Sequence, residues 1–149
     1  MFHNILVATD GSPTAERALA EAIDLAQAYR ARLTVVYVVP PTPSTTLRAP
    51  VNIEQLGREL EEEGKRILAG AVTRVPDDVS VTSRLRHGHA GEEILSELDE
   101  GAYDLVVLGS RGRGRAKSNL LGSVGGHVHF GAHVAMLVIH PDDGAGAGD

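Results

Sequence analysis

The sequence contains no cysteine and no tryptophan, and its aromatic residues are two phenylalanines and three tyrosines among 149 residues. The lack of cysteine excludes disulfides, thiol catalysis and cysteine-based zinc sites. Basic residues are fewer than acidic ones. The chain has 14 lysines and arginines and 20 acidic residues, which gives a formal net charge of −6. This balance disfavours non-specific binding to nucleic acid.

Long hydrophobic runs are missing as well. No apolar run approaches the ~18 residues that a membrane-spanning helix needs. The first four residues lack the basic start of a signal peptide, and Asp10 interrupts the first apolar stretch. We therefore expect a cytoplasmic protein without membrane contact. The length indicates one domain, residues 1–141, followed by a disordered tail, residues 142–149, which has no apolar anchor.

Strand and helix patterns alternate along the chain. Short runs rich in valine, isoleucine and leucine predict strands buried on both faces at 3–8, 33–39, 104–108 and 135–139. Residues 79–85 alternate apolar and polar, which predicts an edge strand with one wetter face. Apolar spacings of three and four predict helices at 15–29, 53–71 and 91–100. This order favours an α/β fold in three layers, with a doubly wound, five-stranded parallel sheet.

The most informative motif follows the strand at 104–108. Gly109, Gly112, Gly122 and Ser123 have the spacing G-x2-G-x9-G-S, and a helix is predicted to begin at its end. Glycines let the backbone approach a ligand closely, and a helix N-terminus offers free N–H groups to an anion. The motif therefore predicts a phosphate site.

Two common phosphate motifs do not fit this segment. A Walker A loop needs glycine before its Lys-Ser pair, but Ala116 precedes Lys117. A dinucleotide fingerprint needs a third glycine where Lys117 stands. Two other interpretations stay open: a flexible loop without a ligand, and a nucleic-acid contact made by the basic side chains Arg111, Arg113, Arg115 and Lys117.

A second loop of the same kind lies near the N-terminus. The first strand leads into Asp10-Gly11, and then Ser12 and Pro13 have the residue types preferred at a helix start. Asp10 is either a ligand contact or a cap of this helix. Ligands of open α/β sheets lie outside the carboxyl ends of the strands, where the strand order reverses. The two loops are predicted to flank one such crevice.

The histidines are candidate metal ligands. They include two H-x-H pairs, at 87–89 and 127–129, and single residues at 133 and 140. Such a pair directs both rings the same way only in an extended segment. Without cysteine, or a helical partner four residues away, the spacing matches no known metal site, and we predict none.

Taken together, these segments resemble the universal stress protein family, in its ATP-binding subgroup. The resemblance rests on ILVATDGS at the start, Val36-Tyr37-Val38, Arg86-His87-Gly88, DLVVLGSRGRG at 104–114 and LLGSV at 120–124. It covers residues 2–141. It implies an adenine-nucleotide alpha-hydrolase-like fold with strand order 3-2-1-4-5, and a homodimer. The strand at 135–139 is nearly all apolar yet would lie at a sheet edge, so we predict that the dimer pairs this strand with its mate.

The resemblance also implies a ligand and the residues that hold it. The ligand is ATP, or ADP or AMP, with Mg²⁺ or Mn²⁺ on its phosphates. Few aromatic residues are present, so aliphatic side chains such as Val38 are expected to contact the base. The implied nucleotide-binding residues are Ala8, Thr9, Asp10, Val38, Gly109, Ser110, Arg111, Gly112, Gly122, Ser123 and Val124.

Two departures from the family pattern concern the last helix and strand. Gly125-Gly126 stands where relatives carry helix-favouring residues, and His133-Val134 precedes the last strand in place of a Pro-Cys-Pro-like approach. The resemblance implies a nucleotide-dependent regulatory protein of the stress response. We expect it to hold ATP rather than turn it over, because no nucleophile–base pair is evident. The alternatives are a slow ATPase that uses the same pocket and a dimeric interaction module without nucleotide.

Overall fold

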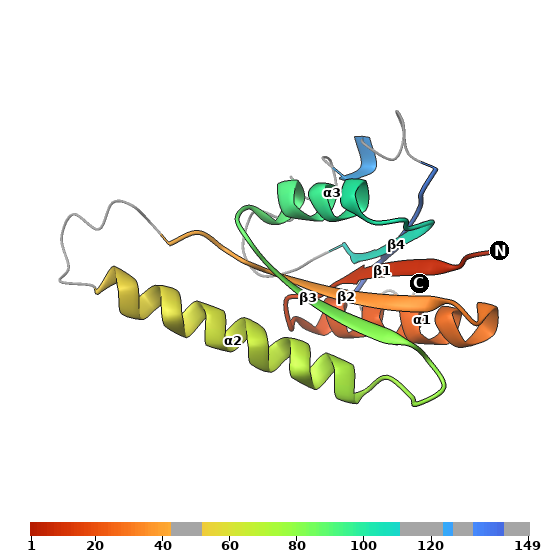
Figure 1. Ribbon diagram of the computed structural model, residues 1–149, viewed down its shortest axis with the longest axis horizontal. Helices are drawn as coiled ribbons and strands as arrows, with labels where there is room; N and C mark the ends of the chain where they lie inside the picture. The colour runs from red at the N-terminus through yellow and green to blue at the C-terminus, as the bar shows by residue number, and fades with distance from the viewer. Residues whose placement is uncertain (43–51, 111–123, 127–132, 142–149) are drawn as a thin grey trace, which may run out of the picture.

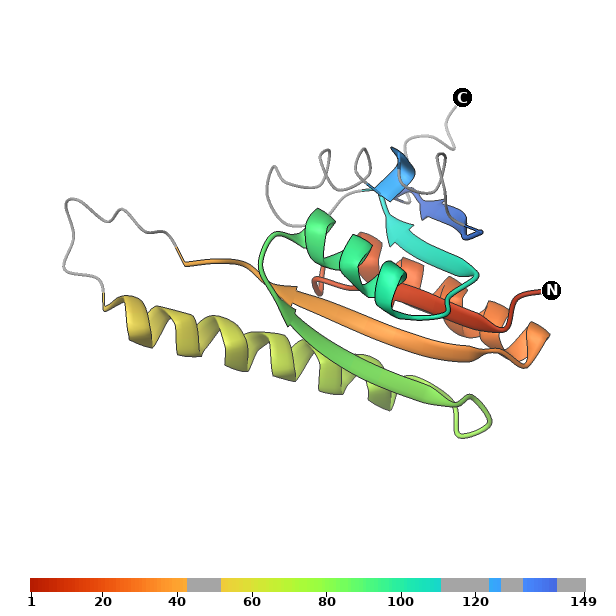
Figure 2. The same ribbon diagram turned by 45° about the horizontal axis from the view of Figure 1, so that its top comes forward.

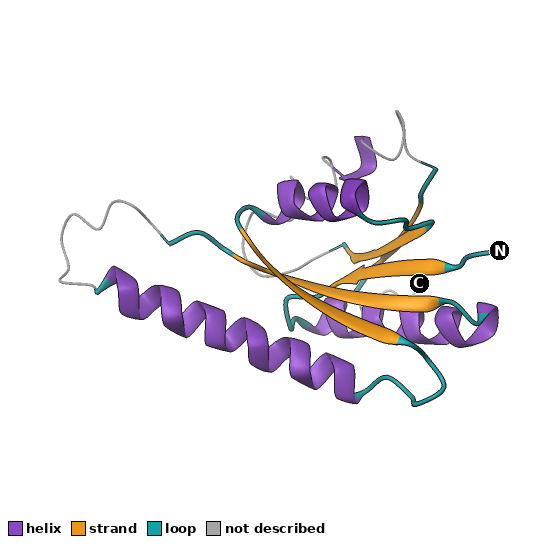
Figure 3. Ribbon diagram, viewed as in Figure 1, coloured by secondary structure: helices purple, strands orange, loops and turns teal. Residues whose placement is uncertain are grey.

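The computed structural model describes residues 1–42, 52–110, 124–126 and 133–141. The expected tail at 142–149 lies outside these residues, as does most of the proline-rich segment at 40–50. Helices and strands alternate along much of the described chain (Figures 1 and 3). In chain order they are β1 (Asn4–Ala8), α1 (Pro13–Tyr29), β2 (Arg32–Val39), α2 (Ile53–Thr73), β3 (Val81–His87), α3 (Ala90–Glu100), β4 (Leu105–Gly109) and β5 (Ala135–Ile139).

All five strands form one parallel sheet in the order β3-β2-β1-β4-β5. This confirms the predicted strand order and places β3 and β5 at the two edges. The prediction for the third strand was wrong by two residues, since β3 begins at Val81 and continues to His87. The reason is local: the Val79 N–H donates to the Pro76 carbonyl at 3.0 Å, so Val79 belongs to the preceding turn.

Helices cover both faces of the sheet, which gives three layers (Figures 1 and 2). On one face, α1 and α2 bury residues such as Leu19 and Leu68 against Val7, Val35 and Val107. On the other face, Ile94 and Leu98 of α3 and the fully buried Val124 pack with Leu6, Val36, Val106 and Leu108. Alternate residues of one strand therefore serve two cores, as the apolar runs predicted.

A network of charged residues joins α3 to β3. The Arg86 guanidinium donates to Glu93 at 2.9 Å, to Glu97 at 2.9 Å and to Glu100 at 3.0 Å. These three carboxylates lie at spacings of four and three, so they share one face of the helix. One arginine of the edge strand thus holds almost the whole length of α3.

Glu97 is the buried centre of this network, with a side chain only 3% exposed. It accepts from the Tyr103 hydroxyl at 2.7 Å and from Arg84 Nε at 3.3 Å, as well as from Arg86. Burial alone would raise the pKa of the Glu97 carboxyl, but the hydrogen bonds from Tyr103 and Arg86 and the charges of both arginines hold it below its usual value of 4.5.

This lowered pKa predicts how stability depends on pH. A carboxyl whose pKa is lower in the folded state stabilises the fold above its unfolded pKa, and that contribution is lost as pH falls through the folded value. We expect Glu97→Gln to cost about 1.5 kcal/mol at pH 7, because charged hydrogen bonds are lost. Its loss of stability below pH 4.5 should be shallower than that of the wild type. Urea unfolding followed by circular dichroism between neutral and acid pH measures both effects, and parallel pH profiles would contradict the assignment.

Candidate functional site

The strand order reverses between β1 and β4, which pair in parallel from Ile5 with Leu105 to Val7 with Val107. After β1 the chain turns into α1 on one face of the sheet. Beyond β4, the described helical residues 124–126 lie on the opposite face, where Val124 is buried. Connections that diverge from the carboxyl ends of adjacent strands mark the usual ligand crevice of an open α/β sheet.

The loop after β1 is held by its own side chains. Thr9 Oγ1 accepts from the Gly11 N–H at 3.2 Å, and Asp10 Oδ1 accepts from the Ser12 N–H at 2.9 Å. Gly11 has φ = 81°, a conformation that side chains disfavour. Ser12 caps α1 by accepting from Ala15 N–H at 3.2 Å, with Pro13 at the first helical position. The predicted helix start is confirmed, and Ser12 rather than Asp10 is its cap.

Val38 brings backbone groups to the same edge of the sheet. Odd-numbered residues of β2 pair with β3, because Leu33 N–H donates to Ser80 and Val39 accepts from Gly88. The even-numbered Val38 therefore directs its N–H and C=O toward β1. The register of β1 with β2 ends at Ala8 and Val36, so these two groups extend past the end of that ladder.

The side chains beside these groups are apolar. Ala8 and Val38 are half-buried and pack against the core under α3. Thr9, between β1 and the turn, is 5% exposed, and its N–H donates to the Val36 carbonyl at 3.0 Å. The carboxyl ends of β1 and β2 thus offer a small aliphatic surface next to a backbone donor and acceptor. This combination suits a flat heterocycle whose rim carries hydrogen-bonding groups.

Seven of the eleven predicted site residues lie in the described part of the chain. Six of them are at the carboxyl ends of three neighbouring strands: Ala8, Thr9 and Asp10 at β1, Val38 at β2, and Gly109 and Ser110 at β4. The seventh, Val124, is buried under the α3 face. Arg111, Gly112, Gly122 and Ser123 lie outside the described residues, so the phosphate part of the site stays a prediction.

Two of the histidines that stand as H-x-H in the sequence lie near the start of α3. His87 ends β3, where its Nε2 lies 2.6 Å from Glu61 Oε1 of α2, and His89 precedes α3 as its cap residue. In the described ranges, no three His, Cys, Asp or Glu side chains gather closely enough to hold a metal ion. Nor does any helix there have the length and apolarity to span a membrane.

The sequence interpretation missed two features of this region. It treated Val38 only as an apolar contact, although alternate residues of β2 face β1 and β3, so that the backbone N–H and C=O of Val38 face β1 beyond its last paired residue. It did not pair Arg84 and Arg86 with α3. The spacing of Glu93, Glu97 and Glu100 on one helical face was the available signal, but nothing local indicated which strand they would meet.

Comparison with known proteins agrees with this architecture. The sequence profile of the universal stress protein family matches residues 1–140. A Thermus aquaticus protein, the universal stress protein in QAH/OAS sulfhydrylase 3'region, is 40% identical over 140 residues, which cover 93% of this chain and 99% of that protein.

Solved structures show the same fold. A universal stress protein family member from Burkholderia pseudomallei superposes with a TM-score of 0.70 at 30% identity, covering 91% of this chain and 94% of its own. A universal stress protein in complex with cAMP superposes with a TM-score of 0.65 at 26% identity, covering 93% of this chain and 97% of its own.

Proposed function

This chain belongs to the universal stress protein family, and we propose that within it the chain is a regulatory protein that holds ATP at the crevice between β1 and β4. The observation that carries the proposal is the position of Val38. Its N–H and C=O extend past the end of the β1 ladder, beside the apolar Ala8. Adenine presents its N6 amino donor beside the N1 acceptor, which matches such a backbone pair, whereas guanine carries an acceptor and a donor in the opposite order.

The rest of the nucleotide has candidate partners in chain order. In this proposal Asp10, which accepts from the Ser12 N–H in the turn after β1, accepts from the ribose hydroxyls or the adenine amino group. Gly109 and Ser110 continue from β4 into the glycine motif. Gly122 and Ser123 directly precede Val124, which is fully buried beneath α3. In this proposal they hold the phosphates at the helix start, with Mg²⁺ or Mn²⁺ carried on the phosphates.

The residues at the carboxyl ends of the strands favour binding of ATP over its hydrolysis. The only carboxylate among the seven described site residues is Asp10, and its Oδ1 already accepts from the Ser12 N–H. The glycine motif also lacks a Walker A lysine. The cAMP complex of a relative at 26% identity supports an adenine nucleotide as the ligand class.

Gentle purification followed by mass analysis of any co-purified nucleotide tests the proposal. Titration calorimetry with Mg-ATP and Mg-GTP then measures whether the protein distinguishes adenine from guanine. We expect ATP to bind at least tenfold more tightly than GTP. Steady release of ADP from bound ATP would favour the slow hydrolase instead. A protein that binds neither nucleotide would leave the interaction module as the better interpretation.

The cytoplasmic location stays a prediction that imaging of a tagged protein tests.

We also propose that the protein is a homodimer that pairs β5 with its mate. Ser110 N–H donates to Ile139, and Ala135 N–H donates to Asp104, so odd-numbered residues of β5 face β4. Met136 and Val138 consequently direct their backbone groups outward from an edge strand that is almost wholly apolar. Such an edge is an aggregation hazard unless it is covered, and a two-fold partner covers it with an identical edge.

Val138→Lys should increase the monomer fraction, because each dimer would bring two charges to this edge. Sedimentation velocity measures the change. Thr82→Lys adds the same charge to the opposite edge strand and should leave the dimer intact. A wild type that is monomeric in the tens of micromolar would contradict the proposed dimer.

A further inference from the structure

In the part of the chain that the structure describes, the outer edge of β3 presents backbone groups that pair with no other strand. Leu33 N–H donates to the Ser80 carbonyl at 2.9 Å, and Gly88 N–H donates to the Val39 carbonyl at 3.0 Å. Because a parallel ladder uses alternate residues, the even-numbered residues from 80 to 88 face β2. The backbone groups of the odd-numbered residues face away from the sheet. They belong to Val81, Ser83, Leu85 and His87.

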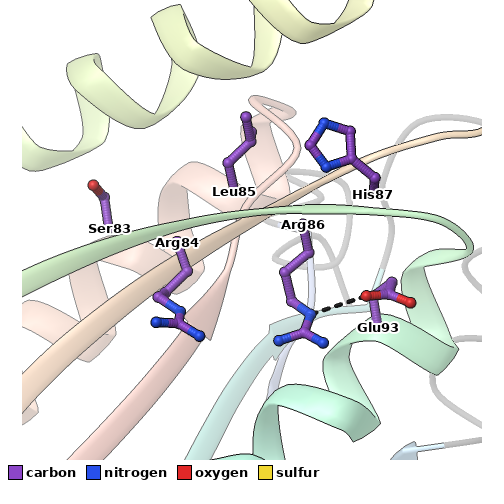
Figure 4. A pocket seen from close by; sticks show the side chains of 6 residues that line it. All are labelled: Ser83, Arg84, Leu85, Arg86, His87 and Glu93. Carbon is purple, nitrogen blue, oxygen red and sulfur yellow. Dashed lines mark hydrogen bonds and ion pairs between the residues drawn. The ribbon is translucent and has the colours of Figure 1, made fainter.

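An open hollow of about 440 Å³ follows this edge (Figure 4). Arg84 and Arg86 point toward α3, whereas Leu85 and His87 point toward α2. An extended segment lying along β3 would therefore meet arginines on one face and an apolar side chain on the other. The residues that line the hollow are Ser83, Arg84, Leu85, Arg86, His87 and Glu93.

The two arginines differ in how fully they are used. All three guanidinium nitrogens of Arg86 bind carboxylates of α3, and its side chain is 16% exposed. Arg84 is bound only through Nε, at 3.3 Å from Glu97, and its side chain is 48% exposed. Among the described residues, its two terminal nitrogens have no hydrogen-bond partner. A guanidinium fork of this kind suits a carboxylate, which it binds through two parallel hydrogen bonds.

The composition of β3 argues against a second copy as the occupant. The strand VTSRLRH carries two arginines, one histidine and no acidic residue, although the whole chain has a net charge of −6. Because Arg86 is already neutralised by the carboxylates of α3, the like charges that pairing two such edges would bring together are those of the two Arg84 side chains. Charged edge strands of this type resist self-association.

We propose that the outer edge of β3 is a docking site for an extended segment of another protein, which adds as a further strand and places an acidic side chain on Arg84. The outward N–H and C=O groups supply the sequence-independent part of the binding. The Arg84 fork supplies selectivity for the acidic residue, as in other sites where a peptide joins an exposed sheet edge. This site lies on the far side of β2 from β1 and does not depend on the proposed nucleotide function.

A fluorescein-labelled peptide, Val-Glu-Val-Glu-Val with blocked ends, probes the site by fluorescence anisotropy. We expect saturable binding with Kd below about 1 mM. The matched Val-Lys-Val-Lys-Val peptide and a fully N-methylated acidic peptide should each bind at least tenfold more weakly. Equal binding of the lysine peptide would overturn the role of Arg84. Equal binding of the N-methylated peptide would show a charge contact without strand addition and would also overturn the proposal.

Two variants locate the binding on the protein. Ser83→Pro removes an N–H that faces outward and leaves the hydrogen bonds with β2 in place, so the sheet should persist. Ser83→Pro should weaken the binding of the acidic peptide at least tenfold, and Arg84→Gln should do the same. Arg66→Gln, on an exposed position of α2, should change binding less than twofold. Circular dichroism verifies that each variant is folded. If the peptide binds Ser83→Pro as tightly as it binds the wild type, it binds elsewhere on the protein. If the Ser83→Pro variant sediments differently from the wild type, this edge is an interface between copies of the chain. Either result overturns the proposal.

Discussion

ATP should bind the Gly122→Val variant well over tenfold more weakly than the wild type, a loss of more than ~1.4 kcal/mol. In the proposed site Gly122 lets the phosphates approach the backbone at the helix start. A β-branched side chain there would block the phosphates and would disfavour any backbone conformation with positive φ. Titration calorimetry with Mg-ATP measures the loss.

Two further variants give the expected order of effects. Ser123→Ala removes one hydrogen bond to a charged group, so roughly 1.5–3 kcal/mol of binding free energy is at stake. Arg113→Ala should matter less and mainly at low salt, because salt screens an exposed charge. Sedimentation and circular dichroism of Gly122→Val should match those of the wild type. If this variant binds ATP normally, the glycine motif has a structural role and the proposed phosphate contacts at Gly122 are wrong.

Gly64→Leu should cost about 3 kcal/mol in the free energy of unfolding, because extra carbons in a closely packed core must displace their neighbours. Gly64 lies on the buried face of α2, directly over Tyr37 of β2. A Cβ atom at this position would be 2.8 Å from two carbons of the Tyr37 ring and 3.1 Å from Leu85 Cδ1. The ring cannot move easily, since Tyr37 is 4% exposed.

Gly70→Leu is the matched control on the same helix. A Cβ atom at Gly70 would have no atom within 4 Å among those the structure describes. Leucine has the higher helix propensity, so this change should stabilise the fold by about 0.8 kcal/mol. Because the chain lacks tryptophan, urea unfolding is best followed by circular dichroism. Equal midpoints for the two variants would mean that α2 can move away from Tyr37 at no cost.

The sheet was predictable because its apolar runs are local signals. Val7 and Val107 serve one core while Leu6 and Val106 serve the other, and a continuous apolar run records this without any knowledge of the partners. The start of β3 was not predictable to the residue, since the turn that holds Val79 depends on a backbone hydrogen bond to Pro76. Alternation alone does not distinguish that turn from the strand.

The candidate site was predictable in outline for a similar reason. The loops after β1 and β4 can be recognised in the sequence, because each contains glycine and is followed by residue types that favour the start of a helix. The role of the Val38 backbone depends on where β1 stops relative to β2, and no sequence pattern encodes that register. The contacts of Glu97 with Arg86 likewise depend on which strand lies beneath α3. Relations between distant segments are what the structure adds.

The pairing of Ile5 with Leu105 has a consequence for the order of folding. Of the five strands, β1 is synthesised before the others, but its second neighbour follows only about 100 residues later, and contacts of such sequence separation form slowly. The chain through β3 can already place three strands together, whereas the crevice does not exist until β4 joins β1. A nucleotide bound there would act after the fold is complete. It would then favour the native state by mass action rather than guide the chain toward it.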